Sequence, residues 1–247
     1  MKNKLKKLGF SALGILFWVL VWQIAAMIIN NPFLLPTVQQ TLAALWDTLL
    51  SVKFLKAVAL SFLRVLAGLG IGVLFGALLA FATNRFSVLR TVTTPLISII
   101  KSTPVASFIV LLWILFDGGT LAIFVAFLMV MPIIWQNLTD GFSAINRELS
   151  ELCDVFEFSY LKRLRLLIFP TLYTYFIPGV ITSVGLAWKS EIAAEIIAYT
   201  KSSIGAMIND AKYFLDTPKV YALTIIVVIM SLLFEGLTKK LMGRFKK

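Results

Sequence analysis

The sequence predicts an all-α polytopic membrane protein with about six transmembrane helices, organised as a single domain over residues 1–247. Hydrophobic residues make up 60% of the chain and charged residues 14%, whereas a soluble domain usually carries about 25% charged residues. The mean hydropathy is +0.93. Apolar runs of about 20 residues, long enough to cross a bilayer as helices, recur along the chain. Because these runs are continuous rather than alternating, they indicate helices and not a β-barrel.

The expected transmembrane helices follow the runs in order, at about 8–29, 57–83, 95–116, 119–136, 171–190 and 220–238. The first is about 22 residues long, which exceeds the roughly 7–15 residues of a signal-peptide core, so we expect a retained helix. A short turn containing Asp117 and Gly118 separates the third from the fourth. Charges at Lys189, Glu191 and Glu195 interrupt the far end of the fifth.

Two further segments are predicted to lie outside the membrane. Residues 37–52 follow Pro36 and carry leucines and Trp46 at helical spacing, which predicts an outer helix. This helix serves either as an interfacial anchor or in a functional role, and the two alternatives stay open. The segment from Asn137 to Phe169 is the longest inner loop and has its own helical pattern.

The distribution of basic residues predicts the orientation of the chain. With the N-terminus inside, sixteen of the 23 Lys and Arg residues fall in inner segments and five in outer segments, and Arg64 and Lys189 fall within the spans. Cytoplasmic loops carry the excess of basic residues in membrane proteins. We therefore expect both termini in the cytoplasm.

The residue inventory argues against catalysis. The chain has no histidine, which removes His-based metal sites and Ser-His or Cys-His catalysis, and Cys153 is the only cysteine. It contains no phosphate-binding loop motif, no H-E-x-x-H and no G-x-S-x-G. We expect no catalytic residue, metal site or cofactor in this chain. The net charge of +11 lies at the ends of apolar runs, which disfavours nucleic-acid binding.

Charged residues within the spans are candidates for function, because a charge at the bilayer centre costs roughly 2.5–3.5 kcal/mol on insertion scales. Arg64 either extends to the outer surface or has a partner in the bundle, with Glu191 or Glu195 as candidates. The two glutamates are four residues apart and share a helix face, so they would repel each other unless a protein cation or a water-filled pathway intervened. The nearby Trp188 and Lys189 favour the pathway.

Glycines and a proline mark expected packing features. Gly68, Gly72 and Gly76 share one face of the second span, which favours close helix packing within one subunit over a contact between subunits. Pro104 follows Thr103 inside an apolar run and predicts a kink, with a static bend favoured over a gate.

The long inner loop contains the motif that carries a family resemblance. Residues 148–157 read ELSELCDVFE, and the loop ends in Phe169-Pro170. The pattern resembles the cytoplasmic motif of the permease subunits of bacterial ATP-binding-cassette (ABC) importers, which is Glu-Ala-Ala, then Gly, then a hydrophobic-x-Leu-Pro ending. Glu151 and Pro170 are in register with it, nineteen residues apart. The departures are Leu152 and Cys153 for the two alanines, Glu157 for the glycine and Phe169 for the leucine.

The resemblance extends along nearly the whole chain and is closest to the nitrate/sulfonate/taurine/bicarbonate branch of these permeases. The most specific stretch is GLAWKSEIAAE at 185–195. Other matching stretches are PFLLPT at 32–37, SFLR at 61–64, KSTPVA at 101–106, Trp113, DGG at 117–119, SIG at 203–205 and DAK at 210–212.

The resemblance implies a type I ABC importer permease in a bacterial inner membrane, with a cytoplasmic coupling helix at about 148–160. It implies a second permease copy, giving a homodimer, and ABC ATPase subunits that hold ATP and Mg. It also implies an extracytoplasmic solute-binding protein. The substrate would be a sulfonate-, nitrate- or taurine-like anion, or a vitamin precursor such as a thiamine pyrimidine.

Two sets of residues are the site candidates under this interpretation. The ATPase-coupling set is Glu148, Glu151, Leu152, Cys153, Asp154, Glu157 and Pro170. The translocation-pathway set is Arg64, Lys101, Ser102, Pro104, Trp188, Lys189, Glu191 and Glu195.

Two competing classes remain. A secondary transporter or channel would work without an ATPase and often shows internal repeats and intramembrane carboxylates. The halves of this chain show no clear repeat, which disfavours that class. A membrane-embedded enzyme is disfavoured by the missing catalytic motifs.

Overall fold

The computed structural model describes residues 2–244, with side chains from Leu13 to Gly243, and all regular structure in that part of the chain is helical. The helices are α1 (Lys2–Ile29), α2 (Val38–Leu49), α3 (Val52–Arg85), α4 (Ser87–Ser102), α5 (Val105–Trp113), α6 (Gly118–Ser143), α7 (Arg147–Val155), α8 (Tyr160–Arg163), the π-helical turn η1 (Leu164–Ile168), α9 (Phe169–Ile197), α10 (Ile204–Tyr213) and α11 (Thr217–Arg244).

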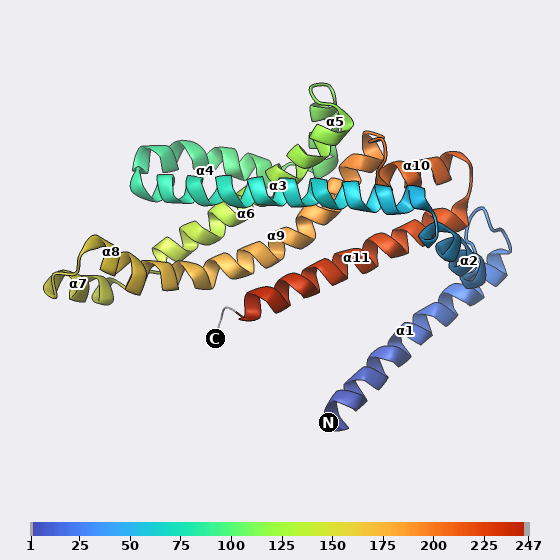
Figure 1. Cartoon of the computed structure of the whole chain (residues 1–247), viewed down its shortest axis with the longest axis horizontal. Coiled ribbons are helices and arrows are strands. Elements are labelled where there is room, and N and C mark those ends of the chain that lie inside the picture. The colour runs from blue at the N-terminus through green and yellow to red at the C-terminus, as the bar shows by residue number, and fades with distance from the viewer. Residues whose placement is uncertain (1, 245–247) are drawn as a thin grey trace.

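The core of the protein is the bundle of α3, α6 and α9, which make the most extensive contacts between helices. Their shared interior is apolar and includes Val65, Val130, Ile134 and Val184. Figure 1 shows α7 and α8 at one end of the bundle and α2 and α10 at the other. The first end is called the α7 end below and the second the α10 end.

The glycines of α3 face α6 within the same chain. A Cβ atom at Gly68 would lie 2.6 Å from the Cβ of Ala126, and one at Gly72 would lie 2.6 Å from the Cβ of Val130. These separations are shorter than any side chain tolerates, so the glycines let the two helix backbones approach closely. Close packing within one subunit, the favoured interpretation of this stripe, is the arrangement in the structure.

Four helical segments are long and apolar enough to cross a membrane: Val52–Arg85, Gly118–Ser143, Tyr160–Ile197 and Thr217–Gly243. A fifth span results if α4 and α5 are counted together. The first expected span corresponds to α1, whose apolar part from Leu13 to Ile29 is shorter than the other four. The structure therefore confirms a polytopic all-helical fold with four or five spans over the described residues, and a sixth stays a prediction.

The third expected span is not one helix. The sequence predicted a single span over 95–116, but α4 begins earlier, at Ser87, and the chain turns by 100° between α4 and α5. Proline has no backbone N–H and pushes the preceding residue towards extended geometry. Thr103 accordingly has φ −79° and ψ 130°. The kink expected at Pro104 is therefore a full break between two helices.

The fifth expected span is longer than predicted. It continues past Ser190 to Ile197, and both Glu191 and Glu195 are buried within α9. The fourth likewise extends beyond 136 to Ser143. Apolar run length underestimates these helices because each continues through polar residues, and sequence composition does not reveal where such residues remain helical.

The outer helix expected at 37–52 corresponds to α2, which packs against α11. Thr37 begins it with a capping box: its side chain accepts from the Gln40 N–H, and the Gln40 side chain accepts from the Thr37 N–H at 2.9 Å. The side chains of Lys2, Lys4, Lys6, Lys7, Arg244, Lys246 and Lys247 lie outside the described part, so the charge asymmetry at the chain ends stays largely a property of the sequence.

Candidate functional site

A buried ion pair joins α3 to α9 near the α10 end of the bundle. The carboxylate of Glu195 is 0% exposed, and the Arg64 side chain is 16% exposed. Arg64 Nη1 donates to Glu195 Oε1 at 2.8 Å, and Ser61 Oγ lies 2.8 Å from both carboxylate oxygens. Of the two sequence alternatives for Arg64, the structure shows the partnered one.

The N-terminus of α10 completes the coordination of Glu195. The Gly205 N–H donates to Glu195 Oε2 at 3.2 Å, and the Ile204 N–H donates to Ser61 Oγ at 3.1 Å. Free N–H groups and the helix dipole make a helix N-terminus favourable for a carboxylate. Ser203 caps the helix by accepting from the Ala206 N–H at 2.9 Å. Three helices are thereby tied to one carboxylate.

Gly205 is required for this approach of α10 to α9. A Cβ atom at this position would lie 2.6 Å from both the carbonyl carbon of Glu195 and the backbone nitrogen of Ile196. These are backbone atoms, which cannot rotate away as the end of a side chain can. Any larger residue at Gly205 therefore separates α10 from the Glu195 carboxylate.

Arg64 also faces the loop that follows α9 and the start of α6. Its Nη2 donates to the Lys201 carbonyl at 3.4 Å, and a Cβ at Gly119 would lie 3.7 Å from its Nε. Asp117, the N-cap of α6, accepts from the Thr120 N–H at 2.9 Å. Hydrogen bonds from Thr120 lower the pKa of Asp117, and the positive charge of Arg64 adds to the effect.

Glu191 lies one helical turn before Glu195 and is also 0% exposed. Neither of its carboxylate oxygens has a hydrogen-bond partner among the described residues. Lys189, on the same helix, is exposed. The three charged residues that lie close together in the sequence therefore have different surroundings. Glu195 is paired, Glu191 is buried without a hydrogen-bond partner among the described residues, and Lys189 is at the surface.

Trp188 packs between helices. Its side chain is fully buried, with ring centroids 6.4 Å from Phe62 on α3 and 6.5 Å from Phe234 on α11. Its indole N–H donates to the Val227 carbonyl at 3.1 Å. In this conformation Trp188 therefore joins α9 to α3 and α11.

The remaining pathway candidates lie at the break between α4 and α5. Lys101, Ser102 and Pro104 are exposed, and no hydrogen bond or ion pair within the described chain joins them to Glu195. They are connected to α9 only indirectly, because Ile109 of α5 packs in a cluster with Ala194.

At the opposite end of the molecule, α7 is a short amphipathic helix with exposed apolar side chains. Asn146 caps it by accepting from the Leu149 N–H at 3.1 Å. Leu149, Leu152 and Val155 are exposed large hydrophobic residues, and the adjacent Phe156 is 68% exposed. Of the coupling candidates, Cys153 is buried, whereas the other members are exposed: Glu148, Glu151, Leu152, Asp154, Glu157 and Pro170.

The end of α7 shows why a glycine suits the position of Glu157. The Phe158 N–H donates to the Cys153 carbonyl at 2.9 Å and the Glu157 N–H donates to the Asp154 carbonyl at 3.1 Å, which is a Schellman motif. Glu157 is its left-handed residue, with φ 48°. This conformation costs a non-glycine residue roughly 1–2 kcal/mol.

Polar contacts hold α7 against the chain that follows it. Arg163 Nη1 donates to Asp154 Oδ1 at 2.7 Å, and Arg163 also donates to Ser150. Arg147 and Glu151 form an exposed ion pair at 3.0 Å on the surface of α7. Sequence reasoning missed the roles of Arg163 and Ser61, because each side chain finds its partners on another helix.

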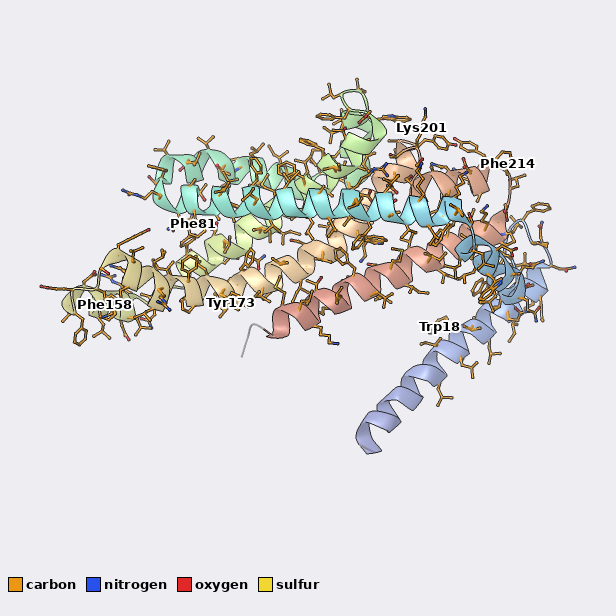
Figure 2. All side chains as sticks on the ribbon, in the orientation of Figure 1. Trp18, Phe81, Phe158, Tyr173, Lys201 and Phe214 are labelled. Carbon is orange, nitrogen blue, oxygen red and sulfur yellow. The ribbon has the colours of Figure 1, made fainter. Side chains whose placement is uncertain are left out.

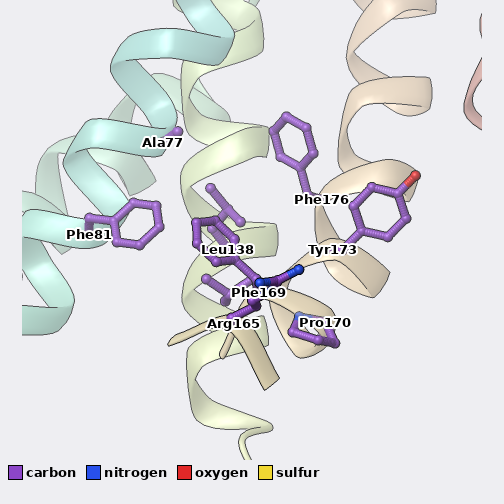
Figure 3. A pocket seen from close by; sticks show the side chains of 9 residues that line it. Ala77, Phe81, Leu138, Arg165, Phe169, Pro170, Tyr173 and Phe176 are labelled. Carbon is purple, nitrogen blue, oxygen red and sulfur yellow. The ribbon is translucent and has the colours of Figure 1, made fainter. Parts of the chain in front are cut away.

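A hollow of about 700 Å³ lies between α3, α6 and the start of α9, towards the α7 end. Figure 3 shows its aromatic wall, formed by Phe81 of α3 and by Phe169, Tyr173 and Phe176 of α9. Arg165 supplies the charged group. Figure 2 places Phe158 at the same end of the molecule and Lys201 and Phe214 at the other.

Comparison with known proteins identifies the family. Residues 72–247 match the family described as binding-protein-dependent transport system inner membrane component, which is more than half of the chain. The protein is a member of this family. It is accordingly an ABC importer permease and a multi-pass inner-membrane protein, and the resemblance carried by the loop motif and the 185–195 stretch is confirmed.

Three named transport permeases align with most of this chain. A protein of Bacillus subtilis (strain 168) named as an aliphatic sulfonates transport permease, SsuC, is 25% identical over 93% of this chain and 83% of its own length. The taurine transport system permease TauC of Escherichia coli (strain K12) is 26% identical over 87% and 80%. The bicarbonate transport system permease CmpB of Synechococcus elongatus is 24% identical over 99% and 88%.

The fold agrees with the family assignment. A solved structure described as an amino acid ABC transporter with histidines superposes with a TM-score of 0.59, covering 90% of this chain and 96% of the other. The sequence identity is 16%, so this likeness concerns the fold alone.

Proposed function

We propose that this family member is the pathway-forming subunit of an importer driven by a separate ATPase, and that α7 is the element that the ATPase contacts. The supporting observation is the exposed apolar surface of α7, which lies outside the bundle at one end of the molecule (Figure 1). Exposed apolar patches rimmed by polar residues commonly mark protein interfaces. Here the rim consists of Glu148, Glu151, Asp154 and Glu157.

The orientation follows from where basic side chains gather. Arg85, Lys162, Arg163 and Arg165 all lie near the α7 end, at the end of α3 or in the α8–η1 segment. Under the positive-inside rule this end faces the cytoplasm, and both chain termini are cytoplasmic. The ATPase, which acts in the cytoplasm with ATP and Mg, would meet α7 there.

The assembly in this proposal has two permease copies, two ATPase subunits and an extracytoplasmic solute-binding protein. The single permease domain would span 1–247. ATP binding would draw the ATPase subunits together, α7 would transmit the movement to α9 through the α8–η1 segment, and the pathway would turn outward. The contact of Arg163 with Ser150 and Asp154 supports this route, because it fixes α7 to the segment that leads into α9.

The proposed substrate is a small anion of the sulfonate, taurine or bicarbonate kind. The names of the three relatives support this class. The hollow beside Arg165 has the chemistry for such a solute, with one guanidinium and an aromatic wall, and it lies towards the α7 end. We place the cytoplasmic part of the pathway there.

The test is recovery of the ATPase with tagged permease after co-expression with the ATPase of the neighbouring genes. Replacing Leu152 and Val155 by aspartate should reduce ATPase recovery by about tenfold or more, because both apolar side chains leave the contact. Glu151→Lys should also lower ATPase recovery, because it reverses a charge in the acidic rim of α7. The matched control replaces Leu42 and Leu49 of α2, which are equally apolar and exposed at the other end.

Unchanged ATPase recovery and unchanged uptake in both α7 variants would exclude α7 as the contact. Recovery of the permease alone, with solute flux in liposomes that is indifferent to ATP, would favour a transporter or channel that needs no ATPase.

A further inference from the structure

No hydrogen-bond donor or cation among the described residues is bonded to the carboxyl group of Glu191, although this group is fully buried. The side chain is 0% exposed, and neither oxygen has a hydrogen-bond partner among the described residues. Glu195, one turn further along α9, is equally buried but receives hydrogen bonds from Arg64, Ser61 and Gly205. Two carboxyl groups of the same chemistry therefore have opposite surroundings.

Among the described side chains, one cation is within reach of the two carboxyl groups. The ionisable groups that act on Glu191 are Glu195 on its own helix and Arg64 on α3, and Arg64 is bonded to Glu195 at 2.8 Å. The other described charged side chains on helices that pack against α9 are at least partly exposed or bonded elsewhere. They are Lys53, Lys56 and Arg85 on α3, Asp140 on α6, Arg165 on η1, Lys189 on α9, Asp210 and Lys212 on α10, and Lys219, Glu235, Lys239 and Lys240 on α11.

An ionised carboxylate without a hydrogen-bond donor or a cation is strongly disfavoured in a buried site, and a second negative charge one helical turn away adds repulsion. A protonated carboxyl is neutral and avoids both penalties. We infer that Glu191 is a proton-binding site, and that the cluster of Ser61, Arg64 and Gly205 keeps the proton there by committing the one nearby cation to Glu195.

The arrangement is a two-state element with one cation, two carboxyls and one proton. If Arg64 turns from Glu195 to Glu191, the O–H bond of Glu191 breaks and an O–H bond forms on Glu195, so the charge of the cluster is unchanged. Such a change requires α3 and α9 to shift relative to each other. Its use in a transport cycle rests on the proposed function, whereas the bound proton does not.

The experiment is infrared spectroscopy of the full chain in lipid nanodiscs in deuterated buffer at neutral pH. The wild type should show the carbonyl band of a protonated carboxyl, and labelling with ¹³C-glutamate should shift that band. Glu191→Gln, a neutral variant of the same shape, should lack the band. The matched control Glu235→Gln, on α11, should keep it.

A wild-type spectrum without the band, or a band that survives in Glu191→Gln, would overturn the inference. If Glu191→Gln does not fold, a labelled wild-type spectrum without a shifted carboxyl band still overturns the inference. Glu195→Gln should also lose the band, because Arg64 is then free to neutralise Glu191, and persistence there would refute the one-cation argument. Since no transport or ATP hydrolysis is measured, failure of the proposed function leaves these readings intact.

Discussion

Replacing Glu195 by glutamine should destabilise the protein more than any exposed charge change. The substitution keeps the shape of the side chain and its capacity to accept from the Gly205 N–H, but it removes the counter-charge beside the Arg64 guanidinium. Glu191 can supply another only if α3 and α9 shift relative to each other, so the observed packing is still lost. Breaking a buried ion pair by removing one partner costs about 3–5 kcal/mol. Arg64 is 16% exposed and so partly hydrated, which places the expected cost at the lower end, about 3 kcal/mol.

For a chain of this size, each kcal/mol corresponds to about 2–4 °C in melting temperature, so Glu195→Gln should melt about 6–12 °C below the wild type. The assay is thermal unfolding in detergent, followed by tryptophan fluorescence, with Arg147→Met in the exposed Arg147–Glu151 pair as the control. That control should shift melting by no more than about 2 °C, because exposed pairs contribute little.

The double variant Arg64→Met with Glu195→Leu decides whether the charge imbalance is the cause. Replacing a buried pair by apolar residues is often neutral, so this double variant should be more stable than Glu195→Gln. A Glu195→Gln variant that melts within about 2 °C of the wild type would refute the reasoning. So would a double variant whose loss equals the sum of the two single losses.

Three further outcomes follow from particular contacts. Gly72→Ala should lower the melting temperature, because its Cβ would lie 2.6 Å from a side chain of α6. Gly70→Ala has nothing within 4 Å of its Cβ, so it should leave the stability unchanged or raise it. Thermal unfolding of the two variants tests both expectations. Glu157 has a left-handed φ of 48°, and a glycine there should stabilise the end of α7 by about 1 kcal/mol. Glu157→Gly should therefore slow hydrogen exchange in α7, and unchanged exchange would contradict the Schellman assignment. The Tyr199 hydrogen bond holds the pKa of Asp210 below 3.8, so this contact contributes stability above pH 3.8 and loses it as pH falls through the lowered pKa. Asp210→Asn should accordingly melt lower than the wild type at neutral pH, and a pH series should show the difference vanish in acid; a constant difference would contradict the assignment.

The candidate site was only partly predictable from the sequence. Arg64 and Glu195 stood out because charges are rare in apolar spans, and their pairing was one of two alternatives. Ser61 and Gly205 appeared only as members of matching stretches. A serine or glycine has no distinctive sequence signal of its own, and its role depends on which backbone lies opposite.

The break between α4 and α5 shows a different limit. Hydropathy places 95–116 in an apolar environment, and Pro104 marks the position where the helix is disturbed. Neither observation gives the 100° angle, because the direction after a break depends on what the next helix packs against. Here α5 packs against α6 and α9, in a cluster that includes Ile109 and Ala194.

Sequence by itself determined that this protein is an all-helical membrane protein, because apolar run length is set by the bilayer and needs no knowledge of tertiary contacts. It also located the loop whose Glu151–Pro170 spacing carries the family resemblance. Only the tertiary structure decided that Arg64 neutralises Glu195 and leaves Glu191 without a partner. The two glutamates have the same chemistry. They differ because α3 and α10 place their hydrogen-bond donors beside the turn of α9 that carries Glu195, and not beside the turn that carries Glu191.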